Sequence, residues 1–101
     1  MDEHIASFKV IIVSPDELVL QTEATKMLVP GIMQELAILP NHTPLYSDLL
    51  KGTVKVFLLD GKTKEIDIEG GILRVRQNQV SIILGFGSDI EKPKKPNPSS
   101  R

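Results

Sequence analysis

The sequence of 101 residues contains no cysteine and no tryptophan. Without thiols the chain has no disulfide bond, no cysteine nucleophile and no cysteine-ligated zinc. Aromatic residues make up only 4% of the chain whereas hydrophobic residues make up 41%, so aliphatic side chains must form most of the core. Valine and isoleucine, which branch at Cβ, fit pleated sheets better than helix interiors, and this composition therefore favours β structure.

The chain also lacks an excess of positive charge and a long apolar run. Its formal net charge is −1 at pH 7, whereas domains that bind nucleic acid present a basic surface to the phosphates. No segment reaches the roughly 18 consecutive apolar residues of a membrane-spanning helix. The start, Met1 to Ser7, does not have the basic and then apolar order of a secretory signal. We expect no nucleic-acid partner, no direct membrane insertion and a cytoplasmic location.

Short apolar runs closed by glycine, proline, asparagine or aspartate recur along the chain, a pattern typical of a β-sandwich or barrel. The strongest hairpin pattern is Asp60-Gly61 between two such runs, because both positions of a two-residue turn tolerate positive φ. A second hairpin is expected around residues 77–79. We predict nine strands: Phe8–Val13, Leu18–Gln21, Thr25–Val29, Glu35–Leu39, Leu45–Leu50, Thr53–Leu59, Lys62–Ile68, Ile72–Arg76 and Val80–Leu84. A helical turn is the alternative for Leu45–Leu50.

The composition changes near the C-terminus. Residues 88–101 include Pro93, Pro96, Pro98 and three lysines, and they offer too little apolar surface to offset the entropy lost on ordering. We therefore expect a β domain over residues 1–87 followed by a disordered tail over residues 88–101.

Residues suited to catalysis or metal binding are few. The only histidines are His4 and His42, and Ser14, Ser47, Asp16 and Asp48 could in principle complete a hydrolytic triad with His42. No nucleophile elbow surrounds either serine, and no metal-ligand spacing is present. We assign no catalytic, cofactor-binding or metal-binding residue, and a hydrolase that uses His42 remains an alternative.

The segment Gly31–Leu45 contains Pro40 and Pro44, which bracket three residues centred on His42. Each proline fixes its own φ and pushes the preceding residue into an extended conformation, so the bracketed backbone is stiff and displayed. Such a loop suits docking to a partner. The alternative is a simple crossover between sheets, with His42 as a hydrogen-bonded loop residue.

This segment also carries a family resemblance. Residues Gln34–Leu45, QELAILPNHTPL, resemble the most characteristic pattern of the ATP synthase epsilon subunit, roughly Gly-Glu-[Phe/Leu]-Gly-Ile-Leu-Pro-Gly-His-[Ala/Thr]-Pro-Leu. Two stretches on either side, Phe8–Leu20 (FKVIIVSPDELVL) and Gly70–Leu84 (GGILRVRQNQVSIIL), resemble the family in the same order. The resemblance spans residues 8–84. The chain departs from the pattern where Gln34, Ala37 and Asn41 replace glycine.

The resemblance implies an all-β fold, a flattened two-sheet β-sandwich of about nine to ten strands. It implies a non-catalytic central-stalk subunit that binds the gamma subunit and the c-ring, touches the catalytic head transiently, and helps to couple proton or sodium transport to ATP synthesis. The complex would lie on the cytoplasmic face of a bacterial inner membrane.

Interface residues follow from the resemblance by position. The residues expected to face the c-ring are Met33, Gln34, Glu35 and Leu36. The residues expected to face gamma are Ser14, His42, Leu45 and Ser47. The family's two C-terminal helices have no counterpart in the proline-rich tail, so we expect neither inhibition of ATP hydrolysis nor ATP binding from this chain.

A small β-sandwich that binds a carbohydrate or peptide ligand is the alternative from another functional class. Such a module predicts a pocket lined by aromatic side chains. The aromatic residues here are few and scattered along the sequence: Phe8, Tyr46, Phe57 and Phe86.

Overall fold

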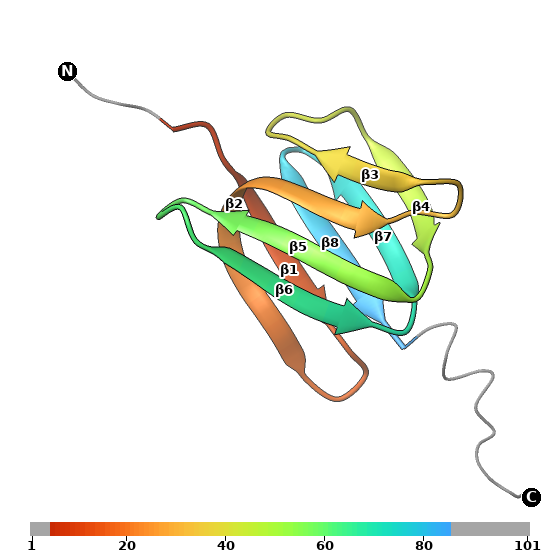
Figure 1. Ribbon diagram of the computed structural model, residues 1–101. Coiled ribbons are helices and arrows are strands. Elements are labelled where there is room, and N and C mark those ends of the chain that lie inside the picture. The colour runs from red at the N-terminus through yellow and green to blue at the C-terminus, as the bar shows by residue number, and fades with distance from the viewer. Residues whose placement is uncertain (1–4, 86–101) are drawn as a thin grey trace, which may run out of the picture.

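The computed structural model describes residues 5–85, which form eight β-strands and no helix (Figure 1). The all-β prediction is confirmed. The predicted tail, residues 88–101, lies outside the described residues. The strands are β1 (Phe8–Val13), β2 (Leu18–Pro30), β3 (Glu35–Ile38), β4 (Leu45–Leu49), β5 (Gly52–Leu58), β6 (Thr63–Ile68), β7 (Gly71–Arg76) and β8 (Gln79–Leu84).

One curled sheet provides both layers of the sandwich. Its strand order is β4-β7-β8-β1-β2-β5-β6, and β3 pairs with β2 outside this path. The first half of β2 pairs with β1, whereas its second half pairs with β5 and β3. Strand β2 therefore belongs to both layers, and Figure 1 shows it curling from one to the other. A bridge between Gly31 and Leu49 joins the layers again at the opposite side.

The length of β2 corrects the predicted strand count. The sequence predicts separate strands at Leu18–Gln21 and Thr25–Val29, but the intervening residues continue the ladder by pairing with the start of β1. A register irregularity between Ala24 and Lys26 marks the change of layer. Such an irregularity bends a strand without ending it, which is why the described residues form eight strands and not nine.

Both predicted hairpins are confirmed, and both predicted turns are corrected. In the β5–β6 hairpin Leu58 N–H donates to the Lys62 carbonyl at 2.8 Å, so the loop has three residues and ends at Gly61 with φ 90°. The two-residue loop at Asp60-Gly61 is wrong, because the third residue allows a type I turn followed by a left-handed glycine. In the β7–β8 hairpin Gln77 and Asn78 alone form the turn, with φ 51° and 60°, whereas Gln79, predicted in the turn, pairs with Arg76 and begins β8.

The core lies between the two layers and is aliphatic apart from Phe8, as the composition predicts. Side chains alternate along each strand, so every second residue faces inward. Strand β1 buries Phe8, Val10 and Ile12, and strand β8 buries Val80 and Ile82, all at 2% exposure or less. The core fills the space between the layers, so the segments left for function are the turns, the edges and the outer faces of the sandwich.

Candidate docking surfaces

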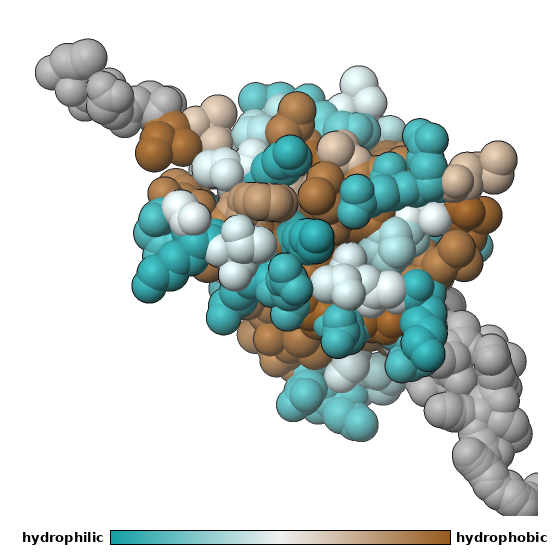
Figure 2. Space-filling model, viewed as in Figure 1, coloured by the Kyte–Doolittle hydropathy of each residue, from teal (hydrophilic) through white to brown (hydrophobic). Residues whose placement is uncertain are grey.

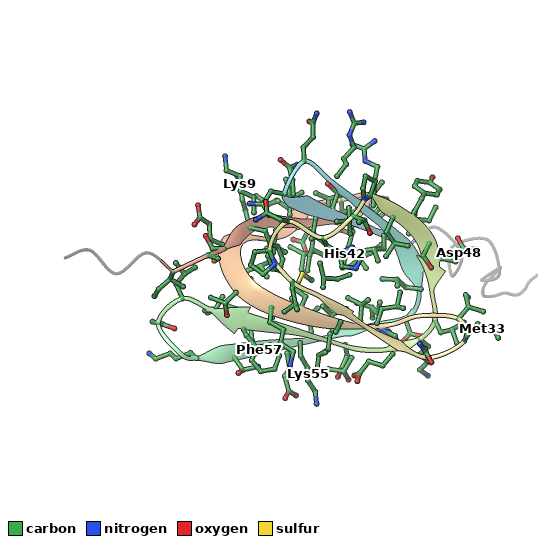
Figure 3. All side chains as sticks on the ribbon, turned by 90° about the horizontal axis from the view of Figure 1, so that it is seen from above. Lys9, Met33, His42, Asp48, Lys55 and Phe57 are labelled. Atoms are coloured by element: carbon green, nitrogen blue, oxygen red, sulfur yellow. The ribbon has the colours of Figure 1, made fainter. Side chains whose placement is uncertain are left out.

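The turn between β2 and β3 projects from one side of the sandwich. Met33 at its tip is 91% exposed and Ile32 is 51% exposed. Leu50, which is 47% exposed, lies beside the turn because its N–H donates to the Pro30 carbonyl at 2.9 Å. We call Ile32, Met33 and Leu50 the tip patch. Figure 2 shows apolar surface gathered at this projecting edge, and Figure 3 shows Met33 pointing away from the body.

Close packing at Gly31 gives this turn its shape. A Cβ atom at Gly31 would lie 2.7 Å from the Gln34 carbonyl oxygen and 2.9 Å from Leu36 Cγ. Only glycine fits such a close approach of backbone to backbone. The turn therefore folds back tightly over Gly31, and Ile32 and Met33 are left on its outer side.

The structure brings together three of the four residues predicted to face the c-ring. Met33, Gln34 and Glu35 are exposed at the turn and at the start of β3. Leu36 is half-buried, pairs with Val29 and packs against the core. Successive residues of a strand point to opposite faces, which places Leu36 inside next to the exposed Glu35.

The sequence did not identify Leu50 as a member of this patch. It follows a strand and precedes Lys51-Gly52, which is a common pattern at strand ends. Its position beside Met33 results from the Gly31–Leu49 bridge and from its bond to Pro30, contacts that no local pattern encodes.

The β3–β4 loop closes one end of the sandwich with a tight turn. His42 N–H donates to the Leu39 carbonyl at 3.2 Å, with Pro40 and Asn41 at the corner. Asn41 has φ 62°, and proline followed by a left-handed residue is the pattern of a type II turn. Asparagine at this position therefore provides the backbone conformation that glycine adopts readily.

His42 is half-buried in this loop. Its Nδ1 atom lies 2.7 Å from the Thr43 carbonyl oxygen, so Nδ1 carries a proton and donates it in a hydrogen bond. Figure 3, which looks down on this end, shows His42 between the two layers. The loop is neither helical nor sunk into the core, and its backbone stays available at the end of the molecule.

The residues predicted to face gamma are distributed along the sandwich. Leu45 and Ser47 pair with Val75 and Leu73 and share their inward orientation, although both are only half-buried. They lie on β4, an edge strand that leads away from His42.

Ser14 lies at the other end. Strand β1 starts beside the β7–β8 turn near the His42 loop and ends at Val13, which pairs with Ile83. Six strand residues span about 20 Å, so Ser14 and His42 are at opposite ends of the layer (Figure 1).

A hydrolytic triad is not assembled among residues 5–85. Ser14 Oγ donates to the Glu17 carbonyl at 3.4 Å, and Ser47 Oγ donates to the Asp48 carbonyl at 2.9 Å. The side chain of His42 is bonded to Thr43 and to neither serine. A serine nucleophile needs a histidine within hydrogen-bond reach, and this arrangement does not provide one.

The described residues also lack a metal site and an aromatic pocket. No three histidine or carboxylate residues within 5–85 are grouped closely enough to hold a metal ion. A surface hollow of about 500 Å³ near the β1–β2 turn has no aromatic side chain in its lining. Phe8 is buried, while Tyr46 and Phe57 lie in different layers. No helix in the described part of the chain is long and apolar enough to span a bilayer.

The outward side of the layer β4-β7-β8-β1 carries an apolar strip that the sequence-based site residues do not include. Cross-strand pairing aligns Tyr46, Arg74, Ser81 and Ile11 in one row, and Asp48, Ile72, Ile83 and Val13 in the next. Tyr46 is 70% exposed and Ile83 is 43% exposed. We call this surface the outer face; its apolar members are Ile11, Val13, Tyr46, Ile72 and Ile83.

A signal for the outer face exists in the sequence. Strands with one wet side alternate apolar and polar residues, but β1 contains Ile11-Ile12-Val13 and β8 contains Ile82-Ile83-Leu84. These runs are apolar on both sides of the strand. Arg74 lies within the strip and Arg76 lies two residues further along β7. Neither side chain has a carboxylate within 4.0 Å among residues 5–85, whose one ion pair joins Lys51 to Glu69.

Comparison with known proteins shows to which family the chain is similar. Residues 7–85 match the family model described as the ATP synthase delta/epsilon chain, β-sandwich domain. The ATP synthase epsilon chain of Bordetella petrii is 40% identical over 79 residues, which cover 78% of this chain and 56% of that protein. The epsilon chain of Desulfitobacterium hafniense is 36% identical over 86 residues, which cover 85% and 64%. The chain thus spans somewhat more than half the length of these relatives.

Two solved assemblies contain chains of similar fold. One is the Euglena gracilis mitochondrial ATP synthase OSCP/F1/c-ring, with a TM-score of 0.75, 24% identity, and coverage of 83% of this chain and 54% of that one. The other is the Tetrahymena thermophila mitochondrial ATP synthase central stalk and c-ring, with a TM-score of 0.66, 12% identity, and coverage of 100% and 81%. At these identities the likeness is one of fold.

Proposed function

Because the chain belongs to the family of the ATP synthase delta/epsilon chain β-sandwich domain, we propose that it docks gamma and the c-ring together in the central stalk of a rotary ATP synthase. The family predicted from residues 8–84 is confirmed by the family match. The chain contributes no catalytic residue and acts by binding. In a bacterium it would lie in the peripheral complex on the cytoplasmic face of the inner membrane.

The observation that carries this proposal is the presence of two separate exposed apolar surfaces on one rigid sandwich. The tip patch projects from one side, and the outer face covers one layer. Contiguous exposed apolar surface marks interaction sites. Two such surfaces support binding to two different partners at the same time, which is the requirement for a stalk component.

We assign the c-ring to the tip patch. Met33, Gln34 and Glu35 are the exposed residues of the turn, and Ile32 and Leu50 extend its apolar part. Methionine has an unbranched and polarisable side chain that adapts to irregular surfaces. A narrow tip of this kind suits contact with the loops of a ring without entry into the bilayer.

We assign gamma to the outer face together with the His42 loop. The outer face extends from Val13 and Ile83 near Ser14 to Tyr46 and Arg74 nearer His42. A partner that lies along it reaches Ser14 at one end and His42 at the other, and it meets Leu45 and Ser47 from the edge of β4. One continuous contact thus accounts for predicted residues that lie about 20 Å apart. Transient contact with the catalytic head would use the same end of the sandwich.

The continuous sheet and filled core of the sandwich fit a part that rotates with its partners. The hydrogen-bonded ladders continue from β4 to β6 with β2 in both layers, and the interior is filled by aliphatic side chains. Close-packed interiors deform little and transmit strain. Force applied at the tip patch is therefore passed to the outer face without large internal shear.

Ile83→Lys tests the gamma assignment. We expect this change at an exposed apolar residue of the outer face to weaken binding of the purified chain to gamma by about tenfold or more, as for a buried interface residue. The matched control is Leu59→Lys, because Leu59 is 40% exposed and Ile83 is 43% exposed but Leu59 lies at the β5–β6 turn. Titration calorimetry gives both affinities.

Failure of the unmodified chain to bind gamma at micromolar concentration would contradict the proposed function. Equal loss of affinity in both lysine variants would contradict the assignment of gamma to the outer face. It would show that the added charge weakens binding wherever it is placed.

A further inference from the structure

Asn78 lies at the second position of the β7–β8 turn and bonds two distant parts of the chain. Its side-chain Oδ1 accepts the Asn41 N–H at 2.7 Å, and its Nδ2 donates to the Ser7 carbonyl at 2.8 Å. These partners are 37 and 71 residues away in sequence. Its own carbonyl accepts the Lys9 N–H at 3.2 Å. One residue therefore joins the β7–β8 turn, the β3–β4 loop and the start of β1.

The two partners determine which side chain can fill this position. The Asn41 amide requires an acceptor and the Ser7 carbonyl requires a donor, and a carboxamide supplies both on a short stem. Asp lacks the donor when ionised, and glycine lacks both groups. Asn78 also has φ 60°, a left-handed conformation in which asparagine is enriched among residues other than glycine. Asparagine therefore satisfies both requirements of this position, the left-handed backbone and a side chain with one donor and one acceptor.

The bond to Asn41 attaches the corner of the β3–β4 loop to the other layer. The remaining backbone bond of that corner, from His42 N–H to the Leu39 carbonyl, lies within the loop itself. Strand β3 pairs only with β2, over four residues, so its own ladder does not tie the loop to β7 and β8. Strand β4 ties the far end of the loop to β7 from Leu45 onward. The bond to Asn78 ties the corner on the other side of His42 to the same layer.

We propose that Asn78 is the positioning residue that holds the His42 loop in the geometry in which it meets gamma. The binding consequence rests on the proposed function, whereas the hold on the loop does not. Loops fixed in their bound conformation lose less entropy on association, so the hold on the loop raises affinity and slows dissociation.

Asn78→Gly in the full chain tests this inference. Glycine keeps the left-handed turn and removes both side-chain bonds, and loss of the bond to Asn41 exposes that amide. We expect hydrogen exchange of the Asn41 amide to accelerate by about three- to tenfold. Dissociation from gamma should accelerate by a similar factor, at a temperature where urea titration shows both proteins to be fully folded. NMR exchange and surface plasmon resonance provide the two readouts.

Two further variants separate positioning from general destabilisation. Gln77→Gly alters the neighbouring left-handed residue, φ 51° and exposed, and should leave Asn41 exchange and gamma dissociation unchanged. Asn78→Asp retains an acceptor for Asn41 but loses the donor to Ser7. It should therefore keep Asn41 exchange and gamma dissociation within about twofold of the unmodified chain, because the bond to Asn41 survives.

The outcomes are distinct. Unchanged Asn41 exchange in Asn78→Gly overturns the hold on the loop. Faster exchange with unchanged gamma dissociation overturns the role in binding and leaves Asn78 as a structural residue. If the unmodified chain does not bind gamma, the proposed function fails, and the exchange rates still decide whether Asn78 fixes the loop.

Discussion

Three residues other than glycine adopt a left-handed backbone in the described chain: Asn41, Gln77 and Asn78. All three lie at the end of the sandwich that carries the His42 loop, and two of them are joined by the 2.7 Å bond from Asn41 to Asn78. Asparagine tolerates this conformation and keeps a polar side chain where glycine has none. At the residue scale, two asparagines shape the end of the sandwich that carries the His42 loop.

Gly31 provides a second prediction at this scale. We expect Gly31→Ala to lower the free energy of unfolding by about 1–3 kcal/mol, because its Cβ would overlap the Gln34 carbonyl oxygen and the neighbouring turn would have to move. Urea denaturation measures the loss. The control is Lys62→Ala at an exposed position, which should change stability by no more than about 0.5 kcal/mol. A Gly31→Ala protein as stable as the control would refute the close approach.

At the scale of elements, the β2–β3 turn is a projection that continues the long strand β2 beyond the body of the sandwich. Strand β2 supplies 13 residues to two layers before it reaches this turn, and β3 anchors the returning chain with four pairs. The tip is held from both sides, yet Met33 at its end contacts almost nothing. The element therefore presents an apolar side chain from a fixed base.

Met33→Lys tests the function of this element. Its side chain is 91% exposed, so the free energy of unfolding should change by no more than about 0.5 kcal/mol. We expect binding to a detergent-solubilised c-ring to weaken by about tenfold, because the change places a charge at the centre of the tip patch. Co-sedimentation with the ring measures this loss. Gamma affinity is the internal control and should stay constant; parallel weakening of both would show that the two surfaces are not independent.

At the scale of the whole molecule, function depends on a core that keeps two docking surfaces in fixed relation. Adjacent residues of β8 illustrate the division, since Ile82 is 0% exposed and Ile83 is 43% exposed. One faces the interior and the other faces the proposed partner. The same strand thus contributes to rigidity with one side and to binding with the other.

The pair Ile82→Ala and Ile83→Ala measures this division. Ile82→Ala should lower the free energy of unfolding by about 2–5 kcal/mol, through lost burial and the cavity left behind. Ile83→Ala should lower it by less than about 1.5 kcal/mol, because much of its surface is already in water. Urea denaturation of both variants measures the two changes in the free energy of unfolding. Similar losses would contradict the placement of Ile82 in the core and of Ile83 outside it.

Sequence patterns predicted the all-β class, the hairpins and the family, because these depend on local alternation, turn residues and a continuous motif. They missed the continuity of β2, since Thr22–Ala24 continue the strand through pairing with β1 and, at Ala24, also with β5. They also missed Leu50 and the outer face as parts of the docking surfaces. Those residues become neighbours through cross-strand register and the Gly31–Leu49 bridge, which join segments far apart in the chain.

By itself, the sequence determined that this chain forms an aliphatic β-sandwich with a stiff proline-bracketed loop and a hairpin at Asp60-Gly61, because side-chain volume, alternation and φ restriction act over a few residues. Only the tertiary structure decided which of these features share a surface. It placed His42 and Ser14 at opposite ends of one layer, turned Leu36 and Leu45 toward the core, and brought Asn78 to Asn41 and Ser7. The physical reason is that sheet register converts distant positions into neighbours, and register is set by the whole hydrophobic pattern and not by any one segment.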